Sequence, residues 1–147
     1  MPSLHACDAE LTAQVGIVAG GGRGIGAATA RRLADEGVQV VSGDLQSDWA
    51  REVADAIRAA GGQAIGVDLD GTSVASQAAI VAAAIETYGG LDFYHSNLAG
   101  GTEGDNDALD CSIEVLDKSF AIKAKSHFLA TQAALPGRAA ERNRKVS

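Results

Sequence analysis

The sequence predicts an α/β fold in which a parallel sheet carries helices on both faces. Three observations predict it: short apolar, strand-like runs alternate with helix-like segments, glycines separate them, and the rhythm continues along most of the 147 residues. Strand–helix–strand units in series require right-handed crossovers and therefore a parallel sheet. Beyond that rhythm the sequence shows no internal repeat.

The first unit contains the motif around which the chain is organised. A strand over residues 15–19 leads into the turn Gly20-Gly21-Gly22-Arg23-Gly24-Ile25-Gly26, and a helix over 24–36 stops at Gly37. A glycine turn that opens a helix forms an anion site, because free N–H groups and the positive end of the helix dipole face the anion. The next strand, over 38–43, ends at Asp44, at the distance expected for binding an adenosine ribose 2′-OH. We therefore interpret the turn as a dinucleotide site and not merely a structural turn.

The later elements follow the same rhythm. We expect a helix with Ser47 or Asp48 as its N-cap that ends at Gly61-Gly62, and then a strand over 63–67 that closes at Asp68. A helix capped by Ser73 follows and ends at Gly89-Gly90. The last two elements are a strand over 91–96 and a helix over 113–135. Proline cannot continue a helix freely, so we expect Pro136-Gly137 to end the last one.

The organisation expected is a loose leader over residues 1–13, a nucleotide-binding domain over 14–136 and a basic tail over 137–147. In the tail four basic residues accompany a single acid, Glu141. A functional basic tail and a frayed, solvated terminus are both open, and we favour the second.

Composition excludes several classes of protein. The hydrophobic content of 46% is ordinary for a globular domain, and the net charge of −7 argues against nucleic-acid binding, which requires a basic face. We expect no membrane span and no signal peptide, because the apolar runs are short and the N-terminus lacks a basic region followed by an apolar one. Cys7 and Cys111 have no metal-ligand partners at useful spacing, which indicates a reducing, cytoplasmic setting.

One loop is rich in acidic residues, as a calcium-binding loop would be, but the spacing of these residues does not match such a loop. The loop contains Glu103, Asp105, Asp107 and Asp110. It lacks glycine at the sixth position counted from Asp105, and Leu116 stands where a bidentate glutamate is required. We therefore expect a solvated acidic loop and no metal site.

These motifs resemble the classical short-chain dehydrogenase/reductase family, which has a Rossmann fold. Gly20-xxx-Gly24-x-Gly26 is similar to the family's cofactor turn, with Ala19 where threonine is usual. Ser96-Asn97-Leu98-Ala99 is similar to the Asn-Asn-Ala-Gly segment that closes the fourth strand, with two or three departures. The resemblance covers about residues 15–135. It implies the strand order 3-2-1-4 and a nicotinamide cofactor.

The resemblance also implies a cofactor site. Its residues are Gly20, Arg23, Gly24, Ile25, Gly26, Asp44, Leu45, Asp68, Leu69, Asn97, Leu98 and Ala99. The glycines would cradle the pyrophosphate, Asp68-Leu69 would flank the adenine, and residues 97–99 would hold the nicotinamide-side ribose. Asp44 implies NAD over NADP, because a carboxylate accepts a bond from a 2′-OH but repels a 2′-phosphate. Arg23 weighs the other way, since a basic residue there can assist a 2′-phosphate, and we give Asp44 more weight.

The family's proton-transfer residues have no match in this chain. The family uses tyrosine in a Tyr-xxx-Lys pair, with a serine and an asparagine, and the lysine lowers the tyrosine pKa. Neither Tyr88 nor Tyr94 has lysine four residues on, and Lys123 takes the position of the asparagine. We therefore expect no catalytic residue here.

The resulting expectation is the cofactor-binding portion of an NAD-dependent oxidoreductase that transfers hydride between nicotinamide and an alcohol or carbonyl substrate. The chain ends about where the family's fifth strand begins, so it is either the N-terminal part of a longer dehydrogenase or a short relative that lost catalysis. Alone it would be inactive. The alternative is a non-catalytic nucleotide-binding or structural partner of a complete family member. By resemblance, residues 113–135 form the interface of a homo-oligomer or hetero-complex.

Overall fold

The computed structural model describes residues 11–100, 104 and 106–145, with residues 137–145 described by their backbone alone. The elements are β1 (Val15–Ala19), α1 (Gly24–Asp35), β2 (Gln39–Asp44), α2 (Ser47–Ala59), β3 (Gln63–Asp68), α3 (Val74–Tyr88), β4 (Phe93–Ser96), α4 (Ile113–Phe120), the π-helical segment η1 (Ala121–Lys125) and α5 (Ser126–Lys145). Most of the predicted leader, residues 1–10, lies outside the described residues, as do the last two residues of the predicted tail.

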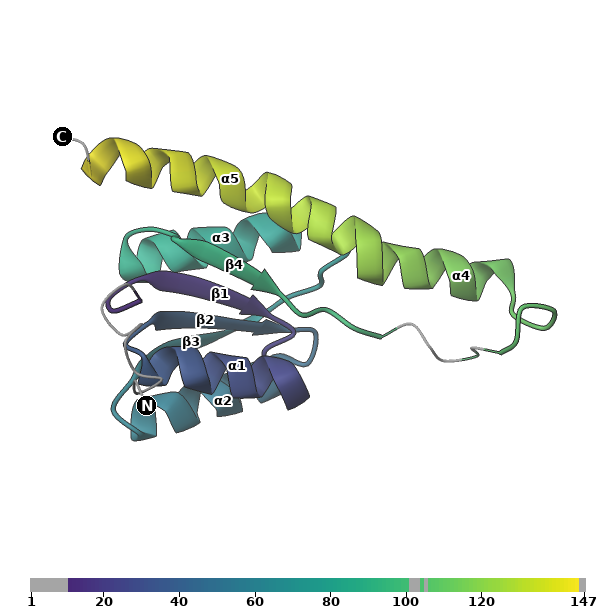
Figure 1. Ribbon diagram of the computed structural model, residues 1–147, viewed down its shortest axis with the longest axis horizontal. Helices are drawn as coiled ribbons and strands as arrows, with labels where there is room; N and C mark the ends of the chain where they lie inside the picture. The colour runs from purple at the N-terminus through teal and green to yellow at the C-terminus, as the bar shows by residue number, and fades with distance from the viewer. Residues whose placement is uncertain (1–10, 101–103, 105, 146–147) are drawn as a thin grey trace, which may run out of the picture.

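The four strands form one parallel sheet in the order β3-β2-β1-β4, which confirms the predicted fold class and strand order. Helices α1 and α2 cover one face, and α3 and α5 cover the other, while α4 projects beyond the sheet (Figure 1). The register pairs Asp44 at the end of β2 with Asp68 at the end of β3. The carboxyl ends of β1, β2 and β3 therefore meet at one edge, where a Rossmann-type sheet binds its ligand.

Two apolar clusters pack against the two faces of the sheet. In β1, Ile17 belongs to the cluster under α3, with Ile80, whereas its neighbour Val18 belongs to the cluster under α2, with Val53 and Ile57. Both β1 side chains are fully buried. Burial on both faces is typical of parallel strands and explains why β1 reads as a continuous apolar run.

The predicted N-cap residue is correct for α3 and wrong for α2. Ser73 caps α3 as predicted, and its Oγ accepts a hydrogen bond from the Ser76 N–H at 3.2 Å. The N-cap of α2 is Gln46, so the prediction of Ser47 or Asp48 was wrong. The reason is that Asp44 Oδ1 accepts a hydrogen bond from the Gln46 N–H at 3.0 Å, which sets the turn one residue earlier.

The C-terminal helix is longer than predicted. Pro136 does not end it, because α4, η1 and α5 follow one another without a break to Lys145. A proline inside a helix removes one N–H donor but has a helical φ, and the carbonyl that it frees belongs to Gln132, an exposed residue that water can reach. The backbone of the predicted basic tail is thus helical as far as Lys145. None of the described helices is long and apolar enough to cross a membrane.

Candidate functional site

The glycine turn after β1 is tied to β2 by its own backbone. The N–H groups of Gly20 and Gly21 both donate to the Gly43 carbonyl, at 2.8 and 3.0 Å. Gly20 has a φ of +73° and Gly24 a φ of +53°, in the left-handed region that favours glycine. The first two N–H groups of the turn therefore hold the turn in place, and the donors for an anion lie further along.

Close packing accounts for two of the motif glycines. A Cβ on Gly26 would lie 1.9 Å from the Gly20 carbonyl oxygen and 3.2 Å from Asn97 Nδ2. A Cβ on Gly20 would lie 2.6 Å from the Asn97 carbonyl oxygen. The predicted residues Gly20, Gly26 and Asn97 thus pack directly against one another, with no room for a side chain at either glycine. Gly24 differs, because a Cβ there would meet nothing within 4 Å.

Helix α1 presents an N-terminus without a capping side chain. Its N-cap residue is Arg23, which makes no side-chain cap hydrogen bond, and the first helical bond runs from the Ala27 N–H to the Arg23 carbonyl at 3.2 Å. The N–H groups of Gly24, Ile25 and Gly26 consequently have no acceptor within the helix. The Ile25 side chain is 74% exposed, so its backbone and not its side chain belongs to the anion site. This is the arrangement that binds a phosphate.

The Asp44 carboxylate lies beside the turn and is held at both oxygens. Oδ2 accepts a hydrogen bond from the Gly22 N–H, and Oδ1 accepts one from the Gln46 N–H, each at 3.0 Å. A carboxylate has about four lone-pair sites, so each oxygen can accept one further donor. A Cβ on Gly22 would lie 2.8 Å from Asp44 Oδ2 and 2.8 Å from Trp49 Cβ, which explains the glycine there.

Arg23 makes a contact that the sequence analysis missed. Its guanidinium carbon lies 3.5 Å from the centre of the Trp49 ring, in a cation–π stack that joins the turn to the first turn of α2. No spacing rule links positions 23 and 49, because their proximity comes from the way the turn packs on α2. The available signal was the presence of an aromatic residue shortly after Asp44.

A cavity of about 330 Å³ lies beyond the ends of β2, β3 and β4. Its lining consists of Leu45, Leu69, Asp70, Gly71, Thr72, Leu98, Ala99, Lys118, Ala121, Ile122 and Ser126. Four of these are predicted site residues, and Lys118 and Ile122 were not predicted because their approach depends on where α4 and η1 lie relative to the loops after the strands. Leu69 is fully buried, whereas its predicted partner Asp68 is exposed and outside the lining.

The surroundings of the two tyrosines, Tyr88 and Tyr94, do not suit a role in proton transfer. The Tyr94 hydroxyl donates to Gln77 Oε1 at 2.6 Å, and burial raises the pKa of Tyr94 although this hydrogen bond opposes the shift. Burial also raises the pKa of Tyr88 and outweighs the nearby Arg58. A proton-transfer tyrosine needs a pKa brought down towards working pH, so both shifts run in the wrong direction. Lys123 lies exposed on η1.

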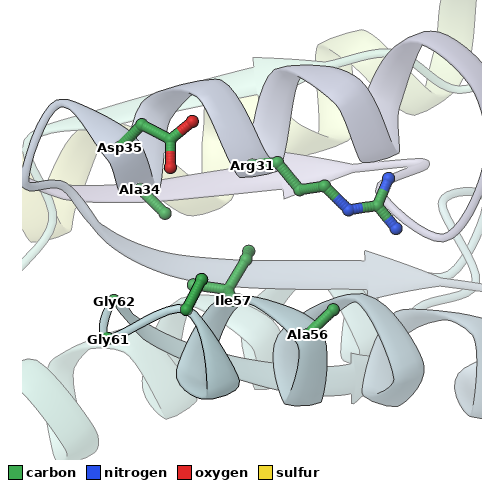
Figure 2. Close-up of a pocket in the computed structure, with 8 residues that line it drawn as sticks. Arg31, Ala34, Asp35, Ala56, Ile57, Gly61 and Gly62 are labelled. Atoms are coloured by element: carbon green, nitrogen blue, oxygen red, sulfur yellow. The ribbon is translucent and has the colours of Figure 1, made fainter.

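A second cavity, of about 370 Å³, lies between α1 and α2 (Figure 2). It is lined by the C-terminal halves of both helices, including Arg31, Asp35 and Ile57, and by Gly61 and Gly62. Because Gly62 immediately precedes β3, this groove opens at the amino ends of the strands, opposite the glycine turn. It is therefore separate from the candidate cofactor site.

Within the described residues no group of three or more histidine, cysteine or acidic side chains is placed to hold a metal ion. Glu103 and Asp105 of the acidic loop lie outside the described residues.

Comparison with known proteins connects this geometry to a family. The family model of the short chain dehydrogenases matches residues 14–144. The chain belongs to the short-chain dehydrogenase family. Short-chain dehydrogenases are oxidoreductases that bind a nicotinamide cofactor, and the family resemblance expected from the glycine turn is thereby confirmed.

Two curated relatives and one solved structure show how far the similarity extends. The chain is 42% identical over 132 residues to 2,5-dichloro-2,5-cyclohexadiene-1,4-diol dehydrogenase LinX of Sphingobium indicum, and 40% identical over 127 residues to 4-formylbenzenesulfonate dehydrogenase TsaC1/TsaC2 of Comamonas testosteroni. Each match covers 86% of this chain and 50% of the relative. The crystal structure of a hydroxysteroid dehydrogenase from Escherichia coli superposes with a TM-score of 0.81 at 29% identity, over 88% of this chain and 54% of that one. The chain thus spans about half the length of the relatives it matches.

Proposed function

We propose that this chain is the NAD-binding portion of a short-chain dehydrogenase. The observation that carries the proposal is the Asp44 carboxylate, which the Gly22 and Gln46 N–H groups fix beside the glycine turn at 3.0 Å each. A fixed carboxylate can accept hydrogen bonds from an adenosine ribose hydroxyl and repels a 2′-phosphate. The charge at this point therefore favours NAD over NADP.

The surrounding residues fit the rest of a dinucleotide. The close packing at Gly20 and Gly26 allows the tight turn that precedes α1, and the N–H groups of residues 24–26 would be the donors to a pyrophosphate. The cavity lined by Leu45, Leu69, Leu98 and Ala99 offers an apolar recess for an adenine ring, and Asp68 would act at its rim. Asn97 would lie on the nicotinamide side. When bound, the nicotinamide ring would accept or donate a hydride.

We propose that this chain does not turn over substrate by itself. Both described tyrosines have a raised pKa, and Tyr94 is engaged with Gln77, so neither supplies the acid or base that a carbonyl oxygen requires. Proton transfer to an alcohol or carbonyl substrate would then depend on residues outside this sequence. Adding candidate alcohols with NAD to the purified chain should yield no NADH absorbance, and measurable turnover would contradict this point.

A second candidate role, as a non-catalytic partner of a complete family member, rests on the edge of the sheet. Among the described strands β4 lies at one edge, and residues of β4 and α5 line a cavity of about 230 Å³ between them. Ser96 lines this cavity, and its buried Oγ has no hydrogen-bond partner in the described structure. An added strand could supply one, because exposed edges pair with other chains. Mixing the chain with a full-length relative and sizing the mixture tests this role, and absence of a hetero-complex would remove its support.

We further propose that residues 113–135 form a subunit interface. Apolar side chains on these helices are exposed, among them Ile113 at 62%, Phe120 at 62% and Phe128 at 61%. Exposed apolar surface of this kind is typical of association sites. We also propose a cytoplasmic location, supported by the free thiol of Cys111, and cell fractionation would test it.

The experiment for cofactor choice is a pair of titrations. Trp49 is the sole tryptophan of the sequence and lies in the first turn of α2, next to Gly22, so its fluorescence reports on the site. Saturable quenching by NADH at lower concentration than by NADPH supports the proposal. Tighter binding of NADPH, or no binding by a chain whose circular dichroism shows it folded, overturns it.

A further inference from the structure

The cation–π pair of Arg23 and Trp49 lies next to the carboxylate that selects the cofactor. Trp49 Cβ and Asp44 Oδ2 would each lie 2.8 Å from a Cβ on Gly22, so tryptophan and carboxylate flank the same glycine. Arg23 is the residue after Gly22, and its guanidinium lies over the indole at 3.5 Å. The Arg23 guanidinium, the Trp49 ring and the Asp44 carboxylate therefore all lie around a single turn.

The Arg23 guanidinium stacks on the Trp49 ring and forms no ion pair with the Asp44 carboxylate. Arg32, Arg51 and Arg58 form ion pairs with acidic side chains three or four positions away, and no ion pair joins Arg23 to Asp44 in the part of the chain that the structure describes. The Asp44 oxygens instead accept backbone N–H groups. A guanidinium is a planar fork that would otherwise bind a carboxylate or a phosphate through two parallel hydrogen bonds.

We propose that Trp49 is a specificity-determining residue that holds Arg23 away from the ribose 2′ position and so preserves the preference for NADH over NADPH. Released from the ring, Arg23 would act in two ways that lower this preference. It would form an ion pair with Asp44, so the carboxylate would accept a weaker hydrogen bond from the 2′-OH. It could also donate two parallel hydrogen bonds to a 2′-phosphate. This inference rests on the proposed NAD function and adds a positioning role for a residue of α2.

The test is a double-mutant cycle on the ratio of the NADPH and NADH dissociation constants, measured by calorimetry because Trp49 is itself replaced. Trp49→Leu removes the aromatic face and is expected to lower the ratio about three-fold, the scale of an exposed cation–π contact. Trp49→Phe keeps a ring and should retain most of the ratio. In the Arg23→Ala background, Trp49→Leu should leave the ratio unchanged, because the cation that it releases is absent.

A second variant, Arg23→Lys, tests the same role of Trp49 if Trp49→Leu does not fold. Arg23→Lys keeps the charge but loses the planar stack, so it should lower the ratio as Trp49→Leu does. If the wild-type chain prefers NADH but neither variant moves the ratio, the Trp49 role alone is wrong. An equal shift by Trp49→Leu with and without Arg23 also contradicts it, since Trp49 would then act through the turn. If the wild-type chain binds neither cofactor, or binds NADPH more tightly, the proposed function fails together with this inference.

Discussion

The Asp44 carboxylate accepts a hydrogen bond from the Gly22 N–H at 3.0 Å, and this bond joins the end of β2 to the glycine turn that follows β1. The two residues are 22 positions apart in the chain. The bond orients the carboxylate towards the region where the N-terminus of α1 offers its free N–H groups. This one local arrangement thus brings a fixed carboxylate close to the N–H groups at the start of α1, which have no acceptor within the helix.

Replacing Asp44 by asparagine should change cofactor preference without dismantling the turn. The amide oxygen can still accept the Gly22 N–H, whereas the amide nitrogen cannot accept the Gln46 N–H, so the start of α2 loses one hydrogen bond. The negative charge is lost as well, so the repulsion of a 2′-phosphate disappears. We expect NADH to bind about ten-fold more weakly, the scale of one charge-assisted hydrogen bond, and the NADPH constant to stay the same or improve. Asp48→Asn is the matched control, since Asp48 is 87% exposed and pairs with Arg51. Equal preference in wild type and Asp44→Asn would argue against the role of Asp44.

Replacing Gly26 by alanine should be far more costly than the same change at Gly24. The new Cβ at position 26 would lie 1.9 Å from the backbone oxygen of Gly20, so the turn must shift, at a cost of about 3 kcal/mol in the free energy of unfolding. At position 24 there is open space, and only the positive φ is unfavourable, at about 1 kcal/mol. Urea denaturation of both variants gives the comparison. A Gly24→Ala variant as unstable as Gly26→Ala would contradict the packing argument.

Tyr94→Phe should reveal the hydrogen bond to the buried amide of Gln77. That amide also donates to the Gly71 carbonyl at 3.0 Å, so it links β4, α3 and the loop between β3 and α3. Removing the hydroxyl leaves Gln77 Oε1 without its donor, and we expect a loss of about 1 kcal/mol in the free energy of unfolding at pH 7.

The same pair predicts an alkaline dependence of stability. Burial raises the pKa of Tyr94, whereas in the unfolded chain the phenol ionises near its ordinary value of about 10. Its contribution is therefore complete below pH 10 and is lost as the pH rises above that value. Wild type should lose stability more steeply than Tyr94→Phe in urea titrations above pH 10. If the free energies of unfolding of wild type and Tyr94→Phe fell in parallel above pH 10, the Tyr94 hydroxyl would be accessible to solvent in the folded protein.

The exposed apolar side chains of α4, η1 and α5 should govern association. A charge in place of Phe120 or Phe128, such as Phe128→Asp, should convert an oligomer to a monomer, because a carboxylate cannot be desolvated in an apolar interface. Light scattering coupled to size exclusion measures the mass. Glu52→Lys, at an exposed position on α2, is the control and should keep the oligomer. A wild-type chain that is monomeric at high concentration would refute the proposed interface.

Most of the fold was predictable because local signals agreed with one another. Ser73 caps α3 as its sequence indicates, and glycines end the helices where the chain turns back. Pro136 misled the prediction, because the helix continues past it and the carbonyl that it leaves without a donor, that of Gln132, lies at an exposed position. The π-helical segment at Ala121–Lys125 has no sequence signature that periodicity detects.

The candidate site was predictable in its backbone and less so in its side chains. The glycine spacing predicted a tight turn after β1 with Asp44 at the end of the next strand, because both features depend on chain geometry. The stack of Arg23 on Trp49 and the lining contributed by Lys118 and Ile122 depend on how separate helices pack, and no spacing in one sequence encodes that. Leu69 shows the same limit, since its neighbour Asp68 is exposed while Leu69 is a fully buried core residue.

The most direct test of the cofactor site is an amide chemical-shift map of the ¹⁵N-labelled chain titrated with NAD. We expect the largest shifts at Gly22, at residues 24–26 and at Gln46, with smaller ones at residues 97–99. Shifts concentrated at Arg31, Gly61 and Gly62 would place the ligand in the groove between α1 and α2. That result, or a map without saturable shifts, would contradict the account.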